Sequence, residues 1–465
     1  MTAIDLAALE DDGTGTHDRD RAGIPRRLER DMNAAARARI HNVGTVVIAP
    51  IRTSVAASAT RPRRIALLLT DLNGGGVQKV TLALAGGLAE RGHHIDIVLY
   101  RPQGVLESQV PPEVHIHHLD VASPYQSRLA ALRADPAALP RLLMPILLAR
   151  RPPHGLNRMP ALATYLHDRR PDALIASAPN CNLAAVWAKR LAGVATRVLI
   201  TEHTAPSMAL TKTGNWRSRY LPKLMHRTYQ QADSIVAVSR ALADDLATVA
   251  HVPRQRITTI YNPVVGPHLQ RLAAEPLDHP WFRPGEPPVI LSAGRLSPQK
   301  DFPTLVRAFA LLRATRRVRL MILGGATSGS KTELRQSDLA AIAAGLGVDD
   351  DVALPGFMPN PYPYMARASV FVLASAWEGF GNVLVEAMAC GCPVVATDCP
   401  TGPAEILAGG RYGPLVPVGD VSSLAAAIGT VLENPPDAAL LRGRADDFTV
   451  DRSVEAYLQA LFGAE

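Results

Sequence analysis

The chain has 465 residues, of which 47% are hydrophobic and 20% are charged, a composition typical of a globular protein with a sizeable core. This length favours two domains of about 150–220 residues each. No stretch approaches about 18 uninterrupted apolar residues, which argues against a transmembrane helix. The acidic start, MTAIDLAALEDDGTGTHDRD, lacks the basic region and apolar core of a signal peptide, so we expect a cytoplasmic protein.

Positive charge is concentrated in one part of the chain. Residues 51–283 contain 28 Lys and Arg against 15 Asp and Glu, whereas residues 284–465 contain 14 against 19. The basic segment should therefore meet an anionic partner. We find no nucleic-acid module and no aromatic residues interleaved with the arginines. A membrane surface or a phosphorylated lipid is favoured over nucleic acid.

The first 60 residues lack sustained periodicity and are expected to form a poorly ordered tail, in which NVGTVVIAPI could add a short strand. From Arg64 the sequence IALLLTDLNGGGVQKVTLALAGGLAERGHHIDIVLY predicts a strand, a glycine loop, a helix and a second strand. This is the β-α-β unit of a doubly wound domain. Further strands are predicted in VHIHHLD, DALIASA, TRVLITEH and SIVAVS.

The segment 137–153, AALPRLLMPILLARRPP, is apolar with arginines near its ends. It could be a helix that covers the sheet, or a basic apolar element that touches a bilayer interface. The sequence leaves both interpretations open.

Five prolines interrupt residues 275–288, EPLDHPWFRPGEPP, which we interpret as a linker. A second series of strands follows in PVILSAGRL, VRLMILGG, DVALPGF, VFVLAS, PVVAT and GPLVPV. We therefore predict a tail (1–60), two doubly wound domains (61–283 and 284–445) and a C-terminal helix (446–465) that could pack back on the first domain. Ligands of such sheets bind beyond the carboxyl ends of the strands, and two such domains imply a cleft between them.

Two glutamates lie in the stretch AWEGFGNVLVEAMACGCPVV, which follows a predicted buried strand. Asn382 is the predicted N-cap of a short helix, and Gly391 is its predicted C-terminal stop. Glu378 then lies in the turn and Glu386 lies in the helix. Eight residues on one helix would separate them by about 12 Å and roughly 80° of rotation, which is too far for a shared proton or a retaining-glycosidase pair.

The glycine-flanked start of this helix offers free N–H groups and a positive dipole, which suit a phosphate. A phosphate with a carboxylate on either side describes a nucleotide-sugar, although polar residues at a helix start could also be purely structural. In LSAGRLSPQKDF, Arg295 and Lys300 follow another strand and could flank a diphosphate. Taken alone, they could equally form a solvated basic turn.

The four cysteines are Cys181, Cys390, Cys392 and Cys399. The C-x-C pair has neither a histidine nor a second cysteine pair nearby at the spacing of a zinc site. We expect small buried thiols in a reducing compartment.

The motifs GRLSPQKDF and EGFGNVLVEAMACGCPVVAT, taken together, resemble the retaining family 4 glycosyltransferases, whose fold is GT-B. The resemblance spans about residues 62–460. The stretches GFMPNPYPYMARASVFVLAS and DCPTGPAEIL are similar to the bacterial members that add sugars to polyprenyl-diphosphate glycans or surface polysaccharides.

The resemblance implies a set of catalytic and substrate-binding residues. They are Glu378 and His203 for catalysis, and Gly75, Gly76, Arg295, Lys300, Asn360, Gly379, Phe380, Gly381, Val383, Leu384 and Glu386 for substrate binding.

The resemblance also assigns these residues to parts of the donor. Glu378 would contact donor sugar hydroxyls and the backbone of Gly379–Gly381 would lie near the sugar and the diphosphate. Val383 and Leu384 would lie near the α-phosphate and ribose, and Glu386 would hold the ribose. Asn360 would lie where the nucleotide base is received.

Arg295 and Lys300 would bind the diphosphate, and His203 would lie near the donor sugar. Many members of the family carry a glutamate just after the first glycine loop, where this chain has Val77-Gln78-Lys79. Details of the acceptor therefore remain open.

The implied reaction moves a sugar from a nucleoside-diphosphate sugar, with UDP favoured, to a glycan or polyprenyl-diphosphate-linked hydroxyl with retention. It would need neither metal nor other cofactor, and the protein would sit peripherally at the inner face of the cytoplasmic membrane. A sugar-nucleotide epimerase, a non-catalytic glycan-binding or scaffold protein and a nucleic-acid binder are the alternatives. An epimerase needs no acceptor, so products formed from nucleotide-sugar alone would distinguish it.

Overall fold

The computed structural model describes residues 61–73, 75–102, 104–138, 155–212, 220–325 and 334–463. The predicted tail, the strand within it and all but the first two residues of the apolar segment 137–153 lie outside the described residues.

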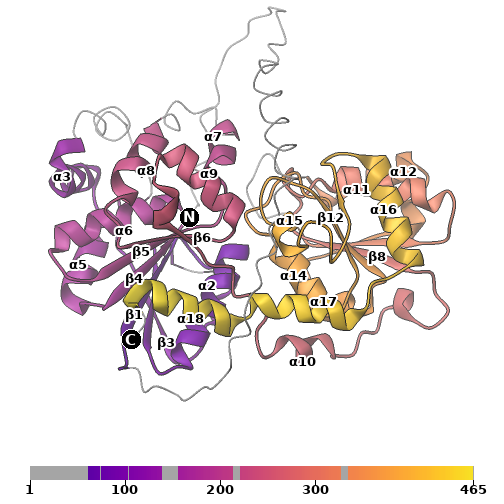
Figure 1. The fold of residues 1–465 in the computed structure, drawn as a ribbon, viewed down its shortest axis with the longest axis horizontal. Helices are drawn as coiled ribbons and strands as arrows, with labels where there is room; N and C mark the ends of the chain where they lie inside the picture. Colours follow the sequence, from indigo (N-terminus) through magenta and orange to yellow (C-terminus); the bar gives the residue numbers. More distant parts are fainter. Residues whose placement is uncertain are drawn as a thin grey trace, which may run out of the picture. The chain divides into compact units, whose positions relative to one another are not determined.

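The first half of the described chain forms a parallel sheet with the strand order β3-β2-β1-β4-β5-β6-β7 (Figure 1). Its strands are β1 (Arg64–Leu69), β2 (His94–Leu99), β3 (Val114–His118), β4 (Ala173–Ser177), β5 (Arg197–Glu202), β6 (Ser234–Ala237) and β7 (Ile257–Thr259). In the central register Leu68 pairs with Val98 on one side and with Ala176 on the other. The central strands β1 and β4 are buried almost throughout and show no polar alternation, because helices cover both faces of a parallel sheet.

Helices lie on both faces of this first sheet. They are α2 (Gly76–Ala89), α3 (Pro124–Ala134), α5 (Met159–Arg169), α6 (Pro179–Ala192), α7 (Pro206–Lys212), α8 (Leu221–Tyr229) and α9 (Arg240–Ala250). Ile65, Leu67 and Leu69 pack with Leu84 of α2, whereas Leu68 packs with Trp187 of α6 on the opposite face. Ser239 caps the start of α9, since its side chain accepts the Leu242 N–H at 3.1 Å.

The second half forms another parallel sheet, with the order β10-β9-β8-β11-β12-β13. Its strands are β8 (Val289–Ala293), β9 (Arg319–Leu323), β10 (Val352–Gly356), β11 (Val370–Leu373), β12 (Val394–Thr397) and β13 (Leu415–Val416). Its helices are α11 (Phe302–Arg313), α12 (Gln336–Gly345), α13 (Tyr362–Arg367), α14 (Asn382–Ala389), α15 (Pro403–Ile406), α16 (Val421–Glu433) and α17 (Ala438–Ala445). The doubly wound architecture predicted for both series of strands is confirmed.

The chain crosses from one half of the molecule to the other twice. After β7, helix α10 (Leu269–Ala273) packs against α13, so the chain has reached the second half before the proline-rich stretch. After α17, helix α18 (Val450–Phe462) packs against α2 and β5. The two passing segments are joined by backbone hydrogen bonds, because the N–H groups of Val264 and Val265 both donate to the carbonyl of Phe448 at 3.0 Å.

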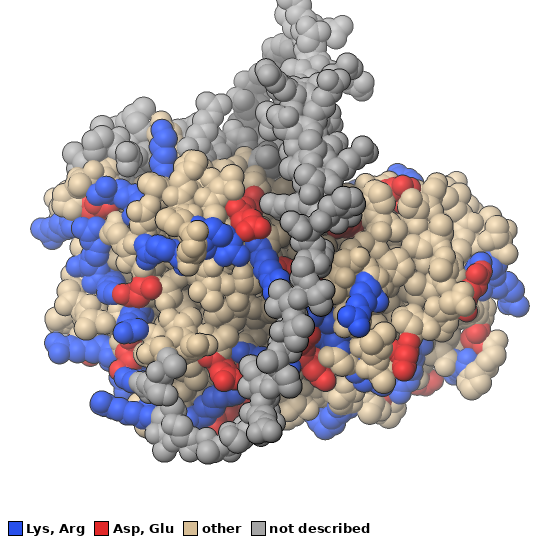
Figure 2. Space-filling model, viewed as in Figure 1, with Lys and Arg blue, Asp and Glu red and all other residues tan. Residues whose placement is uncertain are grey.

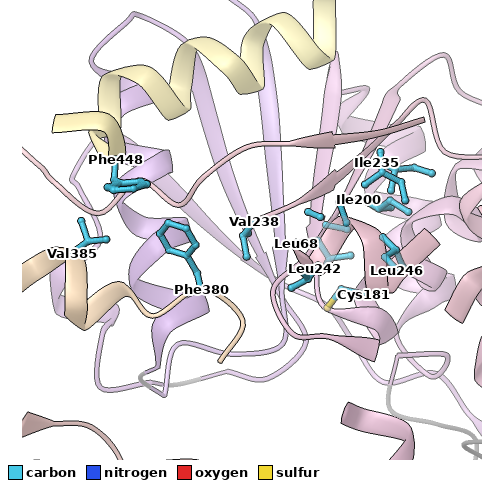
Figure 3. Packing of buried hydrophobic residues seen from close by; sticks show 14 of the residues in the cluster. Leu68, Cys181, Ile200, Ile235, Val238, Leu242, Leu246, Phe380, Val385 and Phe448 are labelled. Atoms are coloured by element: carbon cyan, nitrogen blue, oxygen red, sulfur yellow. The ribbon is translucent and has the colours of Figure 1, made fainter. Parts of the chain in front are cut away.

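An aromatic cluster forms where these two segments meet, and Figure 3 shows two of its rings, Phe380 and Phe448. The Phe380 ring stacks on Tyr261, with centroids 5.5 Å apart, and meets Phe448 edge-on at 5.4 Å. Tyr261 belongs to the first passing segment and Phe448 to the second. The turn that carries Phe380 is therefore anchored to both.

Each sheet has one point at which the strand order reverses, between β1 and β4 in the first and between β8 and β11 in the second. Such a switch point opens a crevice at the carboxyl ends of the two strands, where doubly wound proteins bind ligands. The four cysteines are buried and unpaired, as predicted.

Candidate active site

The loops that follow β8 and β11 meet at the second switch point. The N–H of Ala376, in the turn after β11, donates to the carbonyl of Gln299, in the loop after β8, at 2.8 Å. Lys300 and Glu378 are thereby brought together although 78 positions separate them in the sequence.

Lys300 and Glu378 form a buried ion pair. The Lys300 Nζ lies 2.6 Å from the Glu378 Oε1, and the two side chains are 14% and 8% exposed. Ser375 donates to the same oxygen at 2.7 Å. The other oxygen, Oε2, has a longer contact of 3.4 Å with Gln299, so it is the Glu378 oxygen more available to a ligand.

Gly294 leaves room for the stem of Lys300. A Cβ built on Gly294 would lie 2.9 Å from the Lys300 Cε, so a side chain at this position would require the lysine to shift. On the other side of the pair, Thr401 donates its hydroxyl to the backbone carbonyl of Glu378. The ammonium of Lys300 keeps donors in addition to the one that meets Glu378.

Arg295 differs from Lys300 although both were predicted to bind a diphosphate. Its side chain is exposed and has no ion-pair partner in the part of the chain that the structure describes. Arg295 is thus a long, solvated cation on the surface, whereas Lys300 is largely enclosed and is fixed by its ion pair.

The start of α14 departs from the predicted cap. The N-cap is Gly381, in the left-handed region at φ 103°, and Asn382 is the first residue of the helix. The N–H of Leu384 donates to the Gly381 carbonyl at 2.9 Å, and the Leu384 side chain is buried in the core. The N–H groups of Asn382 and Val383 precede that bond, at the end of the helix where donors lack intrahelical acceptors.

The predicted helix stop at Gly391 is confirmed. Its φ is 79°, and its N–H donates to the carbonyl of Met388 at 2.9 Å.

Glu386 is 8% exposed and lies in the middle of α14. Burial raises the pKa of its carboxyl group, and the positive charges of Lys79 and Lys300 oppose that rise. The carboxylate also raises the pKa of the Tyr362 hydroxyl, which places that ring nearby. Glu386 is therefore a buried acid within the electrostatic reach of two cations.

Gly379 is the point at which the second half touches the end of β5. A Cβ on this residue would overlap the carbonyl oxygen of His203 and approach the N–H of Thr204. Desolvation lowers the pKa of His203 to about 4, so its ring is neutral at pH 7. The structure thus brings together His203 and the turn of Glu378, two predicted features from different halves.

The glycine loop of the first half faces the start of α14. A Cβ on Gly76 would lie 3.6 Å from the Nδ2 of Asn382, whose Oδ1 accepts a hydrogen bond from Asn262 at 2.8 Å. Gly75, with φ 151°, precedes α2 as its N-cap. The amino ends of α2 and α14 therefore approach each other.

Asn360 is used by the protein itself. Its Nδ2 donates to the Leu272 carbonyl at 3.0 Å and to Glu275 at 2.8 Å, while its Oδ1 accepts the Tyr362 N–H at 3.1 Å. Its side chain joins the segment after α10 to α13. A role in recognising the base remains a prediction, and it would fall to the backbone of this loop.

Phe380 likewise contributes no side chain to a ligand, because its ring is 2% exposed within the aromatic cluster. Its predicted role concerns the backbone, as do those of Gly379 and Gly381.

A buried acid next to His203 was not predicted. Glu202 is 1% exposed, accepts hydrogen bonds from Tyr229 and from Asn182, the latter at 2.9 Å, and has no partner on Oε2 among the described residues. Burial raises the pKa of Glu202 to about 7. The motif TEH carries this residue, but a glutamate at a strand end gives no signal of burial.

Ser375 and Lys79 were also missed as members of the site. Ser375 ends an apolar stretch and gave no chemical signal, whereas its contact with Glu378 depends on the path of the turn. Lys79 approaches Glu386 only because two distant helices meet.

Two further findings concern the described residues alone. They contain no group of three or more His, Cys, Asp or Glu side chains suited to hold a metal ion. Among them there is also no helix with the length and apolar character needed to cross a membrane.

Family models match both halves of the chain. The model described as Glycosyltransferase Family 4 matches residues 74–265, and the model described as Glycosyl transferases group 1 matches residues 287–434.

Several curated proteins are similar in sequence. The N-acetylgalactosamine-N,N'-diacetylbacillosaminyl-diphospho-undecaprenol 4-alpha-N-acetylgalactosaminyltransferase of Campylobacter jejuni is 33% identical over 245 residues, 53% of this chain and 63% of that protein. The lipopolysaccharide core biosynthesis glycosyltransferase LpsE of Rhizobium meliloti is 32% identical over 38% of this chain and 51% of that protein. The chain thus spans between half and two thirds of these relatives. A phosphatidyl-myo-inositol mannosyltransferase of Propionibacterium freudenreichii is 28% identical over 82% of this chain and 88% of that protein.

Solved structures share the fold at lower identity. Anabaena HepE in complex with UDP and glucose has a TM-score of 0.67 at 19% identity, over 86% of this chain and 100% of that one. The lipopolysaccharide outer core galactosyltransferase WaaB has a TM-score of 0.62 at 19% identity, over 86% and 99%. With both halves matched by glycosyltransferase models and with this shared architecture, the chain belongs to glycosyltransferase family 4 and has the GT-B fold.

Proposed function

We propose that the protein is a hexosyltransferase that moves a sugar from a nucleoside-diphosphate sugar to a hydroxyl of a glycan or polyprenyl-diphosphate-linked acceptor. The observation that carries the proposal is the cluster at the second switch point. Lys300 and Glu378 form a largely buried pair there, and Glu386 lies one turn into α14, whose amino end begins at Asn382. A diphosphate fits between cations and helix N–H groups, and hydroxyl groups fit the two carboxylates.

The donor would lie across this cluster with its diphosphate at the start of α14. Lys300 and Arg295 would bind the phosphate oxygens, together with the N–H groups of Gly381 to Val383. Glu386 would accept from the ribose hydroxyls, and the Oε2 of Glu378 would accept from sugar hydroxyls. UDP is the nucleotide that we favour, and the structure of HepE in complex with UDP supports that choice.

The chemical step that we propose retains the configuration at the anomeric carbon. The bond from that carbon to the phosphate oxygen breaks, and the acceptor oxygen forms a new bond on the same face. The acceptor proton passes to the departing phosphate oxygen, so no separate carboxylate base is required. Lys300 and Arg295 would stabilise the charge that grows on the leaving diphosphate, which is the largest contribution expected of fixed charges.

Two side chains would act on the sugar during this step. The Glu378 carboxylate, held by Lys300 and Ser375, would stabilise positive charge near the anomeric carbon. His203, whose pKa of about 4 keeps it neutral, would exchange a hydrogen bond with a sugar hydroxyl without adding charge. We propose that the step needs no metal ion.

The acceptor would approach from the first half. The name of the Campylobacter relative describes a diphospho-undecaprenol acceptor, which supports a lipid-linked acceptor for this chain. Figure 2 shows several Lys and Arg side chains on the visible face of the first half. The sequence of residues 51–283, with 28 basic and 15 acidic residues, suits an anionic membrane. We propose peripheral attachment at the inner face of the cytoplasmic membrane.

A panel of nucleotide-sugars tests the proposal. The protein should release nucleoside diphosphate from one donor, and release should rise when glycan or polyprenyl-diphosphate acceptors are added. Isomerised nucleotide-sugar without any acceptor would instead indicate an epimerase. Failure to bind or cleave every donor in the presence of acceptors would contradict the proposal and leave a non-catalytic role.

Attachment to the membrane is tested separately. We expect the protein to sediment with anionic vesicles at low salt and to be released as the salt concentration rises. Equal binding to neutral and anionic vesicles, or binding to neither, would contradict the electrostatic attachment.

A further inference from the structure

Lys79 is a cation that the reaction proposed above does not use. It lies in the first turn of α2, its side chain is exposed, and no hydrogen bond or ion pair engages its ammonium group among the described residues. The buried side of α2, with Leu84, Ala85 and Leu88, faces the first sheet. Lys79 therefore projects away from the core of its own half.

The position of Lys79 follows from helix geometry. Gly76 and Lys79 are three positions apart on α2, and Asn382 and Glu386 are four positions apart on α14, so each pair shares one helix face. A Cβ on Gly76 would lie 3.6 Å from the Nδ2 of Asn382, so the starts of the two helices meet at these residues. The hydrogen bond from Asn262 to Asn382 holds this part of α14 in place. One turn along each helix from this meeting point, Lys79 is close enough to Glu386 for its charge to act on that carboxyl group.

The site therefore contains two carboxylates and two ammonium groups that act on one another. Glu378 is paired with Lys300, and Lys300 and Lys79 both act electrostatically on Glu386. Three of these four groups belong to the second half and Lys79 belongs to the first. No hydrogen bond or ion pair joins Lys79 to Glu386 among the described residues, so the interaction between them is one of charge at a distance.

We propose that Lys79 is a donor-site residue supplied by the first half, which binds the phosphates of the nucleoside diphosphate beside Glu386. This inference rests on the proposed function and adds a ligand contact from the opposite half. Among the described residues of the second half, the cations assigned to the donor site are Lys300 and Arg295, and Lys300 is already paired with Glu378. A diphosphate carries more than one negative charge, and Lys79 adds a further cation from the first half.

The assignment has a consequence for binding. A nucleoside without phosphates contacts Glu386 through its ribose and gains little from Lys79. A nucleoside diphosphate gains a charge-assisted hydrogen bond as well. Removal of the ammonium group should therefore weaken binding of the diphosphate and leave binding of the nucleoside nearly unchanged.

The test measures dissociation constants by titration calorimetry. Wild-type protein is first titrated with UDP, GDP and ADP, and the nucleotide that binds is then compared with its own nucleoside. For Lys79→Ala we expect the dissociation constant of the nucleoside diphosphate to rise at least about 10-fold. The dissociation constant of the nucleoside should change less than about 2-fold. Lys79→Arg should stay within about 3-fold of the wild type, and Lys79→Glu should be weaker than Lys79→Ala, because charge carries the contact.

Lys223→Ala is the matched control. Lys223 is also exposed, lies on α8 of the same half and has no partner among the described residues, so its loss should leave both constants unchanged. Unchanged thermal unfolding of the Lys79 variants would show that they fold normally.

The outcomes separate this inference from the function on which it rests. If the wild type binds no nucleoside diphosphate, the proposed function fails. If the wild type binds and Lys79→Ala binds equally well, the role of Lys79 is overturned while the function stands. An equal loss for nucleoside and diphosphate would overturn the phosphate contact, since Lys79 would then act only through Glu386.

Discussion

The two switch points of this molecule are formed by different kinds of residue. At the second, between β8 and β11, Glu378 and Ser375 are buried and Lys300 is nearly so, and the three are joined by hydrogen bonds of 2.6 and 2.7 Å. At the first, between β1 and β4, the sequence TDLNGGG leads from β1 into α2, where Gly76 and Lys79 are exposed. The same strand topology therefore carries one preformed polar cluster and one open loop.

This difference matches two different tasks. A charge that develops during a reaction is stabilised best by groups that are already fixed, because no reorganisation is then needed. Partners that approach through a flexible or variable contact need space and backbone donors rather than fixed side chains. The second switch point suits the chemistry of a donor, and the first suits a substrate that arrives from outside.

The largest predicted effect comes from breaking the preformed cluster. Lys300→Ala and Glu378→Ala should each reduce turnover by about 100-fold or more, because each removes a charge that acts on the transition state. Steady-state rates of nucleotide release measure this effect. Near-normal turnover in either variant would contradict the assigned role.

A loss of folding must be separated from a loss of catalysis in these variants. Removal of one partner leaves the other charge buried and unpaired, which can cost about 3–5 kcal/mol of stability. The double variant Lys300→Met, Glu378→Gln removes both charges and should unfold close to the wild-type temperature while remaining inactive. An active double variant would show that the pair is structural.

The next effect comes from the contact between the halves. In Gly379→Ala the new methyl group would overlap the carbonyl of His203, so the turn of Glu378 must shift. A misplacement of about 1 Å can cost about 100-fold in rate, and we expect a loss of turnover of about 10- to 100-fold. Gly443→Ala is the control, because a Cβ there meets no atom within 4 Å and α17 tolerates alanine well. Equal activity of the two variants would show that the contact with His203 is not needed for turnover.

Much of the fold could be predicted from local sequence patterns. Continuous apolar stretches such as VFVLAS and PVVAT indicate strands buried on both faces, and the structure places β11 and β12 there. The short strand β7, with three residues, was missed because so short a stretch has no measurable periodicity. The cap at Asn382 was wrong, because Gly381 takes the left-handed conformation that starts the helix and the asparagine side chain bonds to Asn262 instead.

The composition of the site could be predicted, but its contacts could not. Motifs indicated Glu378 and Lys300 as separate ligands of a donor, whereas their mutual ion pair depends on how two loops 78 residues apart fold. The burial of Glu202 and the approach of Lys79 to Glu386 depend on tertiary packing in the same way. Sequence patterns predict which residue types are present at a strand end, and packing decides which of them touch.

A smaller effect should appear in the first half, where Glu202 is buried at the end of β5. Its folded pKa of about 7 exceeds the ordinary 4.5, so its contribution to stability is fully present below about pH 4.5 and is lost as the pH rises through 7. The difference in unfolding free energy between wild type and Glu202→Gln should therefore shift by about 2–3 kcal/mol in favour of the variant from pH 5 to pH 8. Urea unfolding at both pH values measures this shift.

Two comparisons isolate the Glu202 effect. His203 acts with the opposite sign, because its lowered pKa makes the protein lose stability as the pH falls from about 6.5 toward 4, but it is present in both proteins and cancels. Glu113→Gln changes an exposed carboxylate of the same half and should show no such shift. A pH-independent difference for Glu202→Gln would mean that the carboxyl group ionises as it does in water.

The smallest predicted effect concerns Asn360, in the loop before α13, and tests how far the preformed part of the second half extends. Asn360→Ala removes hydrogen bonds to the Leu272 carbonyl, to Glu275 and from the Tyr362 N–H. Because these bonds join protein to protein, we expect a loss of about 1–2 kcal/mol of unfolding free energy and an unchanged dissociation constant for the nucleoside diphosphate. Asp437→Ala, which removes a surface helix cap elsewhere in the same half, should cost a similar amount of stability and serves as the control. Much weaker nucleotide binding by Asn360→Ala with unchanged stability would mean that the Asn360 side chain leaves its protein partners to bind the base. The preformed part of the second switch point would then be limited to the cluster around Lys300 and Glu378.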